Sequence, residues 1–359
     1  MSERHRVRLG EIGTLAEPTT RSMSVTIRDV ASRAGVSIST VSRVLNGTSP
    51  VREEKRQLVL EAADALGYSP NPAALSLLSK KTGGLGVLLP FVGGEFFSEL
   101  LNGMDEAAQE LGMFLLVSTS HRQPGEFRKA IAALDKRVDG LVVMAPELAR
   151  EEAASLLRTK TPVVFLNTDA RGLEADVFNF DNHAGAHALT EHLLRAGHER
   201  IALIAGPQDA HDARESLRGY TDAMTAAGLS TDGLVYSGGF TREAGFSCAM
   251  EILEATPRPS AILAANDYCA LGAISALHQA GVEIPDEIAV CGFDGLASAA
   301  YSVPPLTTAR VPVQEIGYRA IRRLAARVDG NASDHEQQVV PVDLVIRGSS
   351  APAPEAVEA

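Results

Sequence analysis

Near the start of the chain, apolar residues recur at helical spacing in two short groups. The segment VTIRDVASRAGVSISTVSRVL covers residues 25–45, and Gly35 separates its two groups. Thr26 and Ser37 precede the groups, where a hydroxyl oxygen accepts a hydrogen bond from a free N–H group of the first helical turn. Gly35 tolerates the positive φ of a tight turn between helices. The pattern therefore predicts two short helices joined by a tight turn, as in a helix-turn-helix.

The second predicted helix exposes short polar side chains. Val41, Val44 and Leu45 form its apolar seam, and the other positions are small and polar apart from Ile38 and Arg43. Such a helix can approach base edges in the major groove of DNA, where hydroxyls bind bases or phosphates and arginine donates two hydrogen bonds to guanine. The residues expected at DNA are Thr26, Ser37, Ile38, Ser39, Thr40, Arg43 and Asn46. Two short helices around a glycine also occur in other small helical domains, so this pattern alone leaves that alternative open.

From Leu85 onward, short apolar runs alternate with segments of helical spacing. The runs are GVLLP, FLLVS, GLVVM, PVVFL, RIALIAG, SAILAAND and EIAVCGFD. Each is typical of a buried strand that precedes a helix, so the alternation predicts a parallel α/β structure. Loops at the carboxyl ends of parallel strands converge on a crevice, and we expect a small molecule to bind there.

Motifs beyond the two helices carry a resemblance to a known family. A third helix is expected over residues 51–66, and the segment GYSPN follows it. With TIRDVA, AGVS and TVSRVLNG, the run from Val25 to Pro90 resembles the DNA-binding headpiece and hinge of the LacI/GalR family of bacterial transcription regulators. The resemblance implies a small all-α helix-turn-helix headpiece and an α/β two-lobed periplasmic-binding-protein-like domain. The expected boundaries are 1–22 for a disordered N-terminal extension, 23–68 for the headpiece, 69–83 for the hinge helix and linker, 84–348 for the two-lobed effector-binding and dimerisation domain, and 349–359 for a disordered tail.

The resemblance also assigns roles to residues of the hinge. Tyr68 and Asn71 of the GYSPN segment join the expected DNA-binding set. Leu77 matches the leucine that relatives insert into a central base step of the minor groove, which kinks the duplex. Leu75 stands where the family motif usually has arginine, so a common polar hinge contact is missing. Ordinary helix packing is the alternative role for both leucines.

Aromatic and short polar residues follow several of the predicted strands. An aromatic ring stacks on the C–H face of a sugar ring, while amides and carboxylates bind its hydroxyls, so these residue types suit a carbohydrate. The expected effector-binding residues are Phe96, Phe97, Asn167, Arg214, Phe240, Asn266 and Asp294. The resemblance to the LacI/GalR family implies that Phe240, Asn266 and Asp294 match positions that contact the effector in relatives. Alternatively, Asn266 caps a helix and the phenylalanines belong to the core.

Two departures from the family motifs affect the effector. Ser216 stands where relatives often have an arginine that grips the effector, and Arg214 or Arg218 would have to substitute for it. Val311 replaces the glutamine that is usual in the segment that reads TTARVP here. The identity of the effector therefore cannot be transferred from a relative.

The charge of the chain is divided unevenly. The net charge is −12, but residues 1–81 hold 12 Lys and Arg against 8 Asp and Glu. The remainder holds 21 basic residues against 37 acidic ones. A basic end can dock on phosphates while an acidic body stays away from them, which agrees with a DNA-binding headpiece.

Other features narrow the class of protein. No apolar run approaches the roughly 20 residues that span a bilayer, and no secretory signal is seen, so we expect a cytoplasmic protein that does not bind membranes. Cys248, Cys269 and Cys291 are too far apart for a CxxC motif and are expected to be buried thiols. His183 and His187 lack a third metal ligand nearby, so solvent-facing histidines are favoured. We expect no metal and no cofactor.

The two ends of the chain carry further expectations. The segment MSVTIRDVA makes Met23 an alternative start of translation to Met1. The last residues, SSAPAPEAVEA, contain prolines and no leucine heptad of the kind that joins tetrameric relatives. We therefore expect a homodimer.

Together these observations predict a ligand-responsive, sequence-specific transcription regulator. We expect a repressor of carbohydrate uptake or catabolism genes that binds a pseudo-palindromic operator in double-stranded DNA as a homodimer. A small sugar or sugar derivative between the lobes would alter operator affinity, by induction or by corepression. The alternatives are a corepressed or activating regulator, a sugar-binding module without a DNA role, and an enzyme. No paired acid and base or nucleophile spacing supports the enzyme.

Overall fold

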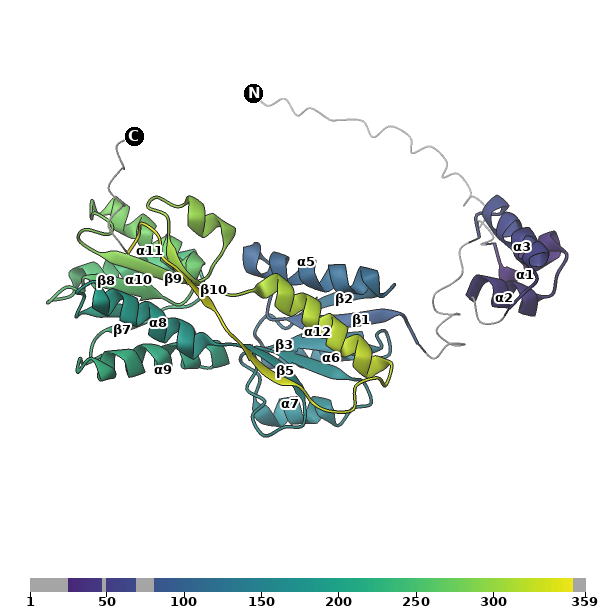
Figure 1. Ribbon diagram of the computed structural model, residues 1–359, viewed down its shortest axis with the longest axis horizontal. Helices are drawn as coiled ribbons and strands as arrows, with labels where there is room; N and C mark the ends of the chain where they lie inside the picture. The colour runs from purple at the N-terminus through teal and green to yellow at the C-terminus, as the bar shows by residue number, and fades with distance from the viewer. Residues whose placement is uncertain (1–24, 47–49, 69–80, 351–359) are drawn as a thin grey trace, which may run out of the picture. The chain divides into compact units, whose positions relative to one another are not determined.

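The computed structural model describes residues 25–46, 50–68 and 81–350. The chain divides into two compact units between residues 80 and 81, and their helices and strands are labelled in Figure 1. In the described residues, the first unit contains helices only, and the second is built on two largely parallel sheets. The predicted fold class is confirmed.

The first unit is a cluster of three helices, α1 (Ile27–Ala34), α2 (Ile38–Asn46) and α3 (Glu53–Ala65). Gly35 has a φ of 62° between α1 and α2, as the predicted tight turn requires. The N–H and hydroxyl of Thr26 both donate to the carboxylate of Asp29, at 2.8 and 2.7 Å, and so close the first turn of α1. Each helix contributes a fully buried valine to a small common core: Val30, Val41 and Val59.

The second unit contains two six-stranded sheets in the described residues, which define a first and a second lobe. The first sheet has the order β11-β5-β4-β3-β1-β2, and all its strands are parallel. The second has the order β12-β10-β9-β8-β6-β7, and β12 runs antiparallel to β10. The strands of the first lobe are β1 (Gly84–Leu89), β2 (Phe114–Thr119), β3 (Gly140–Met144), β4 (Val163–Leu166), β5 (Asp176–Phe180) and β11 (Gln337–Val340). Those of the second are β6 (Ile201–Ala205), β7 (Val235–Ser237), β8 (Ala261–Ala264), β9 (Ala289–Asp294), β10 (Thr307–Arg310) and β12 (Asp343–Val345).

Helices cover both faces of each sheet, which is why the central strands are apolar throughout. In the first lobe, two helices share one apolar core with the sheet, α5 (Gly94–Glu110) and α12 (Val313–Val328), and two pack on the other face, α6 (Pro124–Leu134) and α7 (Arg150–Leu157). The second lobe repeats this arrangement with α8 (Asn182–Arg195) and α9 (His211–Ala226) on one face and α10 (Arg242–Glu254) and α11 (Asp267–Gln279) on the other. A short 3₁₀ helix, η1 (Ala297–Tyr301), follows β9.

The backbone passes between the lobes at three places, from β5 to α8, from β10 to α12 and from β11 to β12 (Figure 1). The α12 helix and β11 therefore belong to the first lobe although they follow most of the second in sequence. All seven predicted apolar runs form strands, namely β1 to β4, β6, β8 and β9. The short strands β5, β7, β10, β11 and β12 were not predicted.

At two predicted boundaries the ordered contacts of the second unit extend a few residues further. Residues 81–83 were assigned to the linker, but the N–H groups of Thr82 and Gly83 donate to the two carboxylate oxygens of Asp139, at 2.6 and 2.8 Å. The tail is expected from residue 349, yet Ser349 and Ser350 are buried, and their hydroxyls donate to Val290 O and Thr307 Oγ1. The predicted extension over residues 1–22 and most of the hinge lie outside the described residues. The three cysteines are buried, as predicted.

Close helix packing in the first lobe depends on glycine. A Cβ atom on Gly103 of α5 would lie 1.9 Å from the carbonyl oxygen of Gln314 in α12. Likewise, a Cβ on Gly317 of α12 would lie 2.3 Å from the carbonyl oxygen of Leu100 in α5. Backbone atoms cannot rotate away as a side chain can, so the two helices would have to separate.

We expect the change Gly103→Ala to lower the free energy of unfolding by about 2 kcal/mol, because overpacking forces the backbone apart. The matched change is Gly125→Ala near the start of α6, where an added Cβ meets no atom within 4 Å. Gly125→Ala is expected to leave the free energy of unfolding unchanged or to raise it by about 0.5 kcal/mol. Urea unfolding followed by circular dichroism measures both, and equal midpoints for the two variants would contradict the prediction.

Candidate DNA-binding surface and effector pocket

The predicted DNA-binding residues of the second helix lie together at the start and on the exposed face of α2. Ser37 precedes α2, and its Oγ lies 2.8 Å from both Ser39 Oγ and Thr40 Oγ1. The N–H of Thr40 donates to the same oxygen at 3.2 Å, which confirms Ser37 as the helix cap. Ile38 is 45% exposed, an unusual position for an isoleucine, and Arg43 is exposed. This face therefore offers three hydroxyls, one branched apolar side chain and one guanidinium.

Of the remaining predicted DNA contacts, the structure describes Thr26, Asn46 and Tyr68. Thr26 caps α1, and its hydroxyl is bonded to Asp29 rather than free. Tyr68 packs partly against the core of the three helices. Asn46 is the last residue of α2. Asn71 and Leu77, with Leu75, lie outside the described residues.

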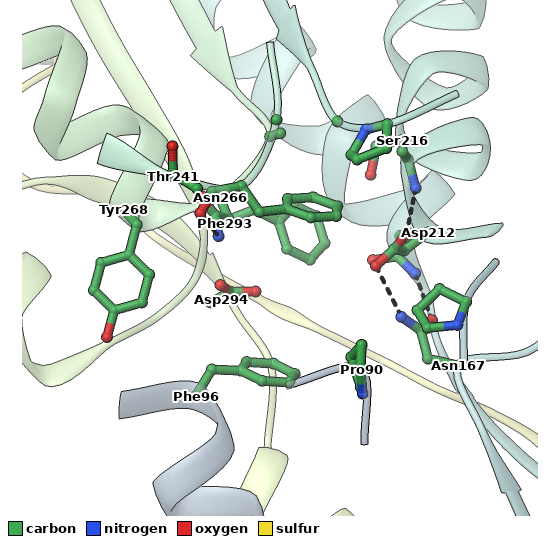
Figure 2. A pocket seen from close by; sticks show the side chains of 18 of the residues that line it. Pro90, Phe96, Asn167, Asp212, Ser216, Thr241, Asn266, Tyr268, Phe293 and Asp294 are labelled. Carbon is green, nitrogen blue, oxygen red and sulfur yellow. Dashed lines mark hydrogen bonds between the residues drawn. The ribbon is translucent and has the colours of Figure 1, made fainter. Parts of the chain in front are cut away.

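A cavity of about 570 Å³ lies between the two lobes, where the carboxyl ends of their strands face each other. This volume is within the range of pockets that hold small ligands. Figure 2 shows part of its lining, with Phe96 and Asn167 from the first lobe facing Asn266 and Asp294 from the second. Six of the seven predicted effector residues line it: Phe96, Phe97, Asn167, Phe240, Asn266 and Asp294. The predicted crevice is therefore present.

Arg214 is the exception, because it does not line the cavity. It is exposed, and its guanidinium donates to the carbonyl oxygen of Asp209 at 2.7 Å. Its neighbour Arg218 pairs with Glu215. The pocket-lining face of α9 carries Asp212, Ala213, Ser216 and Leu217, and the arginines lie on other faces of that helix.

The alternative roles predicted for these residues are also present. The carboxamide oxygen of Asn266 accepts from Cys269 N at 2.9 Å and caps α11, while its Nδ2 donates to Phe240 O at 3.3 Å. Phe96 and Phe97 are each only 8% exposed and pack edge to face with ring centroids 5.3 Å apart. These rings belong to the core and wall the pocket at the same time.

Several pocket residues were not predicted. Arg122, which follows β2, and Tyr268, in the first turn of α11, both line the cavity, as do Asp212 and Phe293. The strand-end rule that selected Asn167 would have selected Arg122 as well, because the run FLLVS had been identified. Tyr268 and Asp212 lie in first helical turns and gave no separate signal.

Polar contacts join the lobes on both sides of the pocket. Asn167 Nδ2 donates to Asp212 Oδ2 at 3.1 Å, a bond visible in Figure 2. On the other side, Tyr268 Oη accepts from Glu95 N at 2.6 Å, and the Glu95 carboxylate accepts from Ser298 N at 2.9 Å. These bonds connect the lobes in a closed arrangement around the cavity.

The pocket holds carboxyl groups with shifted pKa values. Burial raises the pKa of Asp212 to about 6, although hydrogen bonds from Ala213 N and Asn167 and the charge of Arg122 oppose the shift. Burial also raises the pKa of Asp294 well above its usual value, and the carboxylates of Asp267, Asp212 and Glu99 add to this effect. Negative charge in the pocket is therefore unfavourable in the absence of a cation.

The pKa of Asp212 makes stability depend on pH. Its folded pKa of about 6 exceeds the unfolded value, so the folded state loses stability as pH rises from about 4 to 6. We expect Asp212→Asn to be more stable than the wild type by about 2 kcal/mol at pH 7.5 and equal to it near pH 4. Thermal unfolding at both pH values tests this. Asp209→Asn, at an exposed carboxylate beside Arg122, is the control, and an equal gain in that variant would contradict the assignment.

Two negative expectations concern metals and membranes. The His183 ring bonds Asp222 at 2.8 Å, and the rings of His183 and His187 lie 6.1 Å apart. Among the residues that the structure describes, no group of three His, Cys, Asp or Glu is arranged to hold a metal ion. Within the same residues, no helix is long and apolar enough to cross a membrane.

Comparison with known proteins agrees with both units. Residues 26–71 match the family model of bacterial regulatory proteins, lacI family, and residues 190–350 match that of a periplasmic binding protein-like domain. The HTH-type transcriptional regulator DegA of Bacillus subtilis is 32% identical over 92% of this chain and 99% of its own length. The ribose operon repressor of Escherichia coli is 34% identical over 90% of this chain and 99% of its own length.

Solved structures agree as well. A crystal structure of the lac repressor dimer bound to operator and the anti-inducer ONPF matches with a TM-score of 0.84 and 32% identity, covering 91% of this chain and 99% of the repressor chain. The complex of the transcriptional regulator CelR with cellobiose matches with a TM-score of 0.70 and 30% identity, covering 90% and 99%. The similarity extends over the headpiece and both lobes, so the chain belongs to the lacI family of bacterial regulatory proteins.

Proposed function

We propose that this protein is a repressor of carbohydrate uptake or catabolism genes whose affinity for its operator depends on a small carbohydrate bound between the lobes. One observation carries the proposal: the same chain combines an exposed α2 face, suited to base edges, with an aromatic-lined pocket in a separate unit. The similar lac repressor is known with operator and anti-inducer, and CelR with cellobiose. A homodimer would place one headpiece on each half of a pseudo-palindromic operator.

The proposed mechanism links the two sites through the lobes. A ligand that changes how the lobes close changes the balance between two conformations of the regulator, and operator affinity changes by the same coupling free energy. Ser37, Ile38, Ser39, Thr40 and Arg43 are the proposed base and phosphate contacts of α2. The pocket itself needs no catalysis for this role, and the protein acts in the cytoplasm, where its DNA target lies.

The proposal is tested by operator binding of the Arg43→Ala variant. We expect the operator to bind about 10- to 100-fold more weakly, because an arginine bidentate to guanine contributes about 1 to 3 kcal/mol of discrimination. The operator is first found by titrating DNA from upstream of the protein's own and neighbouring genes. Fluorescence anisotropy gives the affinity, and a panel of sugars tests release or strengthening.

The control variant makes the same change of charge elsewhere. Arg258→Ala removes an arginine that pairs with Glu287 at 3.3 Å on the surface of the second lobe. It should bind the operator within about twofold of the wild type, since an exposed charge outside the headpiece acts on DNA only through long-range fields that salt screens. Equal loss in both variants, or none in Arg43→Ala, would refute the role of α2. Release by a sugar indicates induction, and tighter binding indicates corepression.

A further inference from the structure

Asp294 presents an unpartnered carboxylate to the pocket. It ends β9 with a φ of 111°, a strained backbone conformation of the kind that concentrates at ligand sites. Figure 2 shows its carboxylate pointing into the open space with no hydrogen bond. No described residue donates a hydrogen bond to it, whereas Asp267 next to it accepts from Thr308 Oγ1 and Leu296 N at 2.6 and 2.7 Å. Asp294 is half-buried and lines the cavity, so a ligand that fills the cavity would cover this carboxylate, and an unpartnered carboxylate that loses its contact with water is costly. The carboxylate is therefore placed to receive a donor from the ligand.

We propose that the pocket binds a ring-bearing ligand that carries a protonated amine, and that Asp294 pairs with this amine. The inference rests on the proposed function, because it names the chemical class of the effector of the same pocket. The proposed effector is the size of a small carbohydrate and carries a positive charge, as an amino sugar does.

The charges around Asp294 support a cation. The charged groups that act on it are Asp267, Asp212 and Glu99, all acidic, and they raise its pKa together with burial. A phosphate or carboxylate placed here would meet the same charges, and its burial without a counter-ion would be strongly unfavourable. An ammonium group would instead neutralise them.

The basic side chains of the pocket are engaged elsewhere. Arg122 lies 3.6 Å from Asp209, and its guanidinium carbon is 5.9 Å from the centre of the Phe240 ring. Arg242 lies over the ring of Tyr268, at 4.5 Å. The pocket face of α9 contributes Asp212 and Ser216 and no arginine. The second lobe therefore offers the ligand carboxylates rather than a free cation.

The walls of the pocket complete this chemistry. Phe96, Phe293 and Tyr268 surround the space around Asp294 in Figure 2, and Phe91, Phe97 and Phe240 also line the cavity. Aromatic faces attract cations through their quadrupole and stack on the apolar face of a ring. A cavity of about 570 Å³ accommodates such a ring with room for a further group. A carboxylate among aromatic faces suits an ammonium group better than it suits a neutral or acidic one.

The experiment compares ligands that share a ring and differ in the charge of one substituent. Two series are titrated into the full-length protein by calorimetry at pH 7: glucose, glucosamine, N-acetylglucosamine and glucose 6-phosphate, and benzyl alcohol, benzylamine and benzoate. We expect the amine of at least one series to bind at least tenfold more tightly than its neutral and acidic analogues. Asp294→Asn should remove this preference, and the surface variant Asp286→Asn should keep it.

The outcomes separate this inference from the proposed function. If no amine binds more tightly than its neutral analogue, or if Asp294→Asn keeps the preference, the inference is overturned. Operator binding of the wild-type protein is measured alongside. Specific operator binding that a neutral sugar or an acidic ligand releases would leave the proposed function in place and overturn the amine. Absence of specific operator binding would refute the proposed function, whichever ligand binds.

Discussion

Replacing Asp176 with alanine is expected to lower the free energy of unfolding by about 3 to 5 kcal/mol, because it removes the buried carboxylate that Arg323 and Arg327 share, and leaves Arg323 only its longer ion pairs with Glu336 and Asp334. Asp176 begins β5 and is 1% exposed. Arg323 Nε and Arg327 Nε of α12 donate to its two oxygens at 2.8 and 2.6 Å, and Glu336 N donates at 2.8 Å. The carboxylate therefore joins β5, α12 and the segment that leads into β11.

The pH dependence of this contribution follows from its pKa. Burial acts to raise the pKa of Asp176, but the hydrogen bonds from Arg327, Glu336 N and Arg323 outweigh it, and the pKa is lowered. A lowered folded pKa gives stability that is present above the unfolded value and is lost as pH falls through the folded one. The difference between the wild type and Asp176→Ala should therefore be full at pH 7 and shrink in acid.

Urea unfolding at pH 7 measures the loss. Asp343→Ala is the control, because Asp343 pairs with Arg310 at 3.1 Å at the surface, where the two side chains are 74% and 57% exposed. An exposed pair contributes about 0 to 1 kcal/mol, so this variant should unfold nearly as the wild type does. A loss below about 1 kcal/mol for Asp176→Ala would show that the network is not a major source of stability.

Operator affinity is expected to fall about 1000-fold between about 50 and 200 mM salt, while effector affinity changes by less than about threefold. The basic excess of residues 1–81 would contact phosphates and release their counter-ions. The effector pocket lies between the lobes, where salt screens partly buried charges less than exposed ones. The two kinds of binding should therefore respond to salt in different ways.

Fluorescence anisotropy over a series of salt concentrations gives the slope for the operator, and calorimetry gives the effector affinity at the same concentrations. A scrambled duplex of equal length is the control, because it retains the phosphate contacts and loses the base contacts. The scrambled duplex should bind more weakly than the operator, and its affinity should also fall as salt rises, because the phosphate contacts remain. Operator binding that does not weaken with salt would argue against docking by the basic end.

The site was predictable where it depends on local geometry. Asn266 and Asp294 were found because a parallel strand delivers its last residues to one edge of the sheet. Arg214 was expected to substitute for the arginine of relatives, but its angular position around α9 places it outside the pocket lining, and a motif resemblance says nothing about that angle. Arg122 and Asp212 belong to different lobes, so their proximity is a long-range property.

By itself, the sequence determined the periodicity of α1 and α2, the turn at Gly35 and the seven apolar strands, since helical spacing, capping and buried runs are short-range signals. It also located the pocket at the strand ends. Only the tertiary structure decided the pairing of β5 with β11 and of β10 with β12, because these partners are distant in sequence. The same holds for the burial of Asp176 beneath α12 and the isolation of Asp294 among acidic neighbours, because desolvation and charge pairing depend on which segments meet.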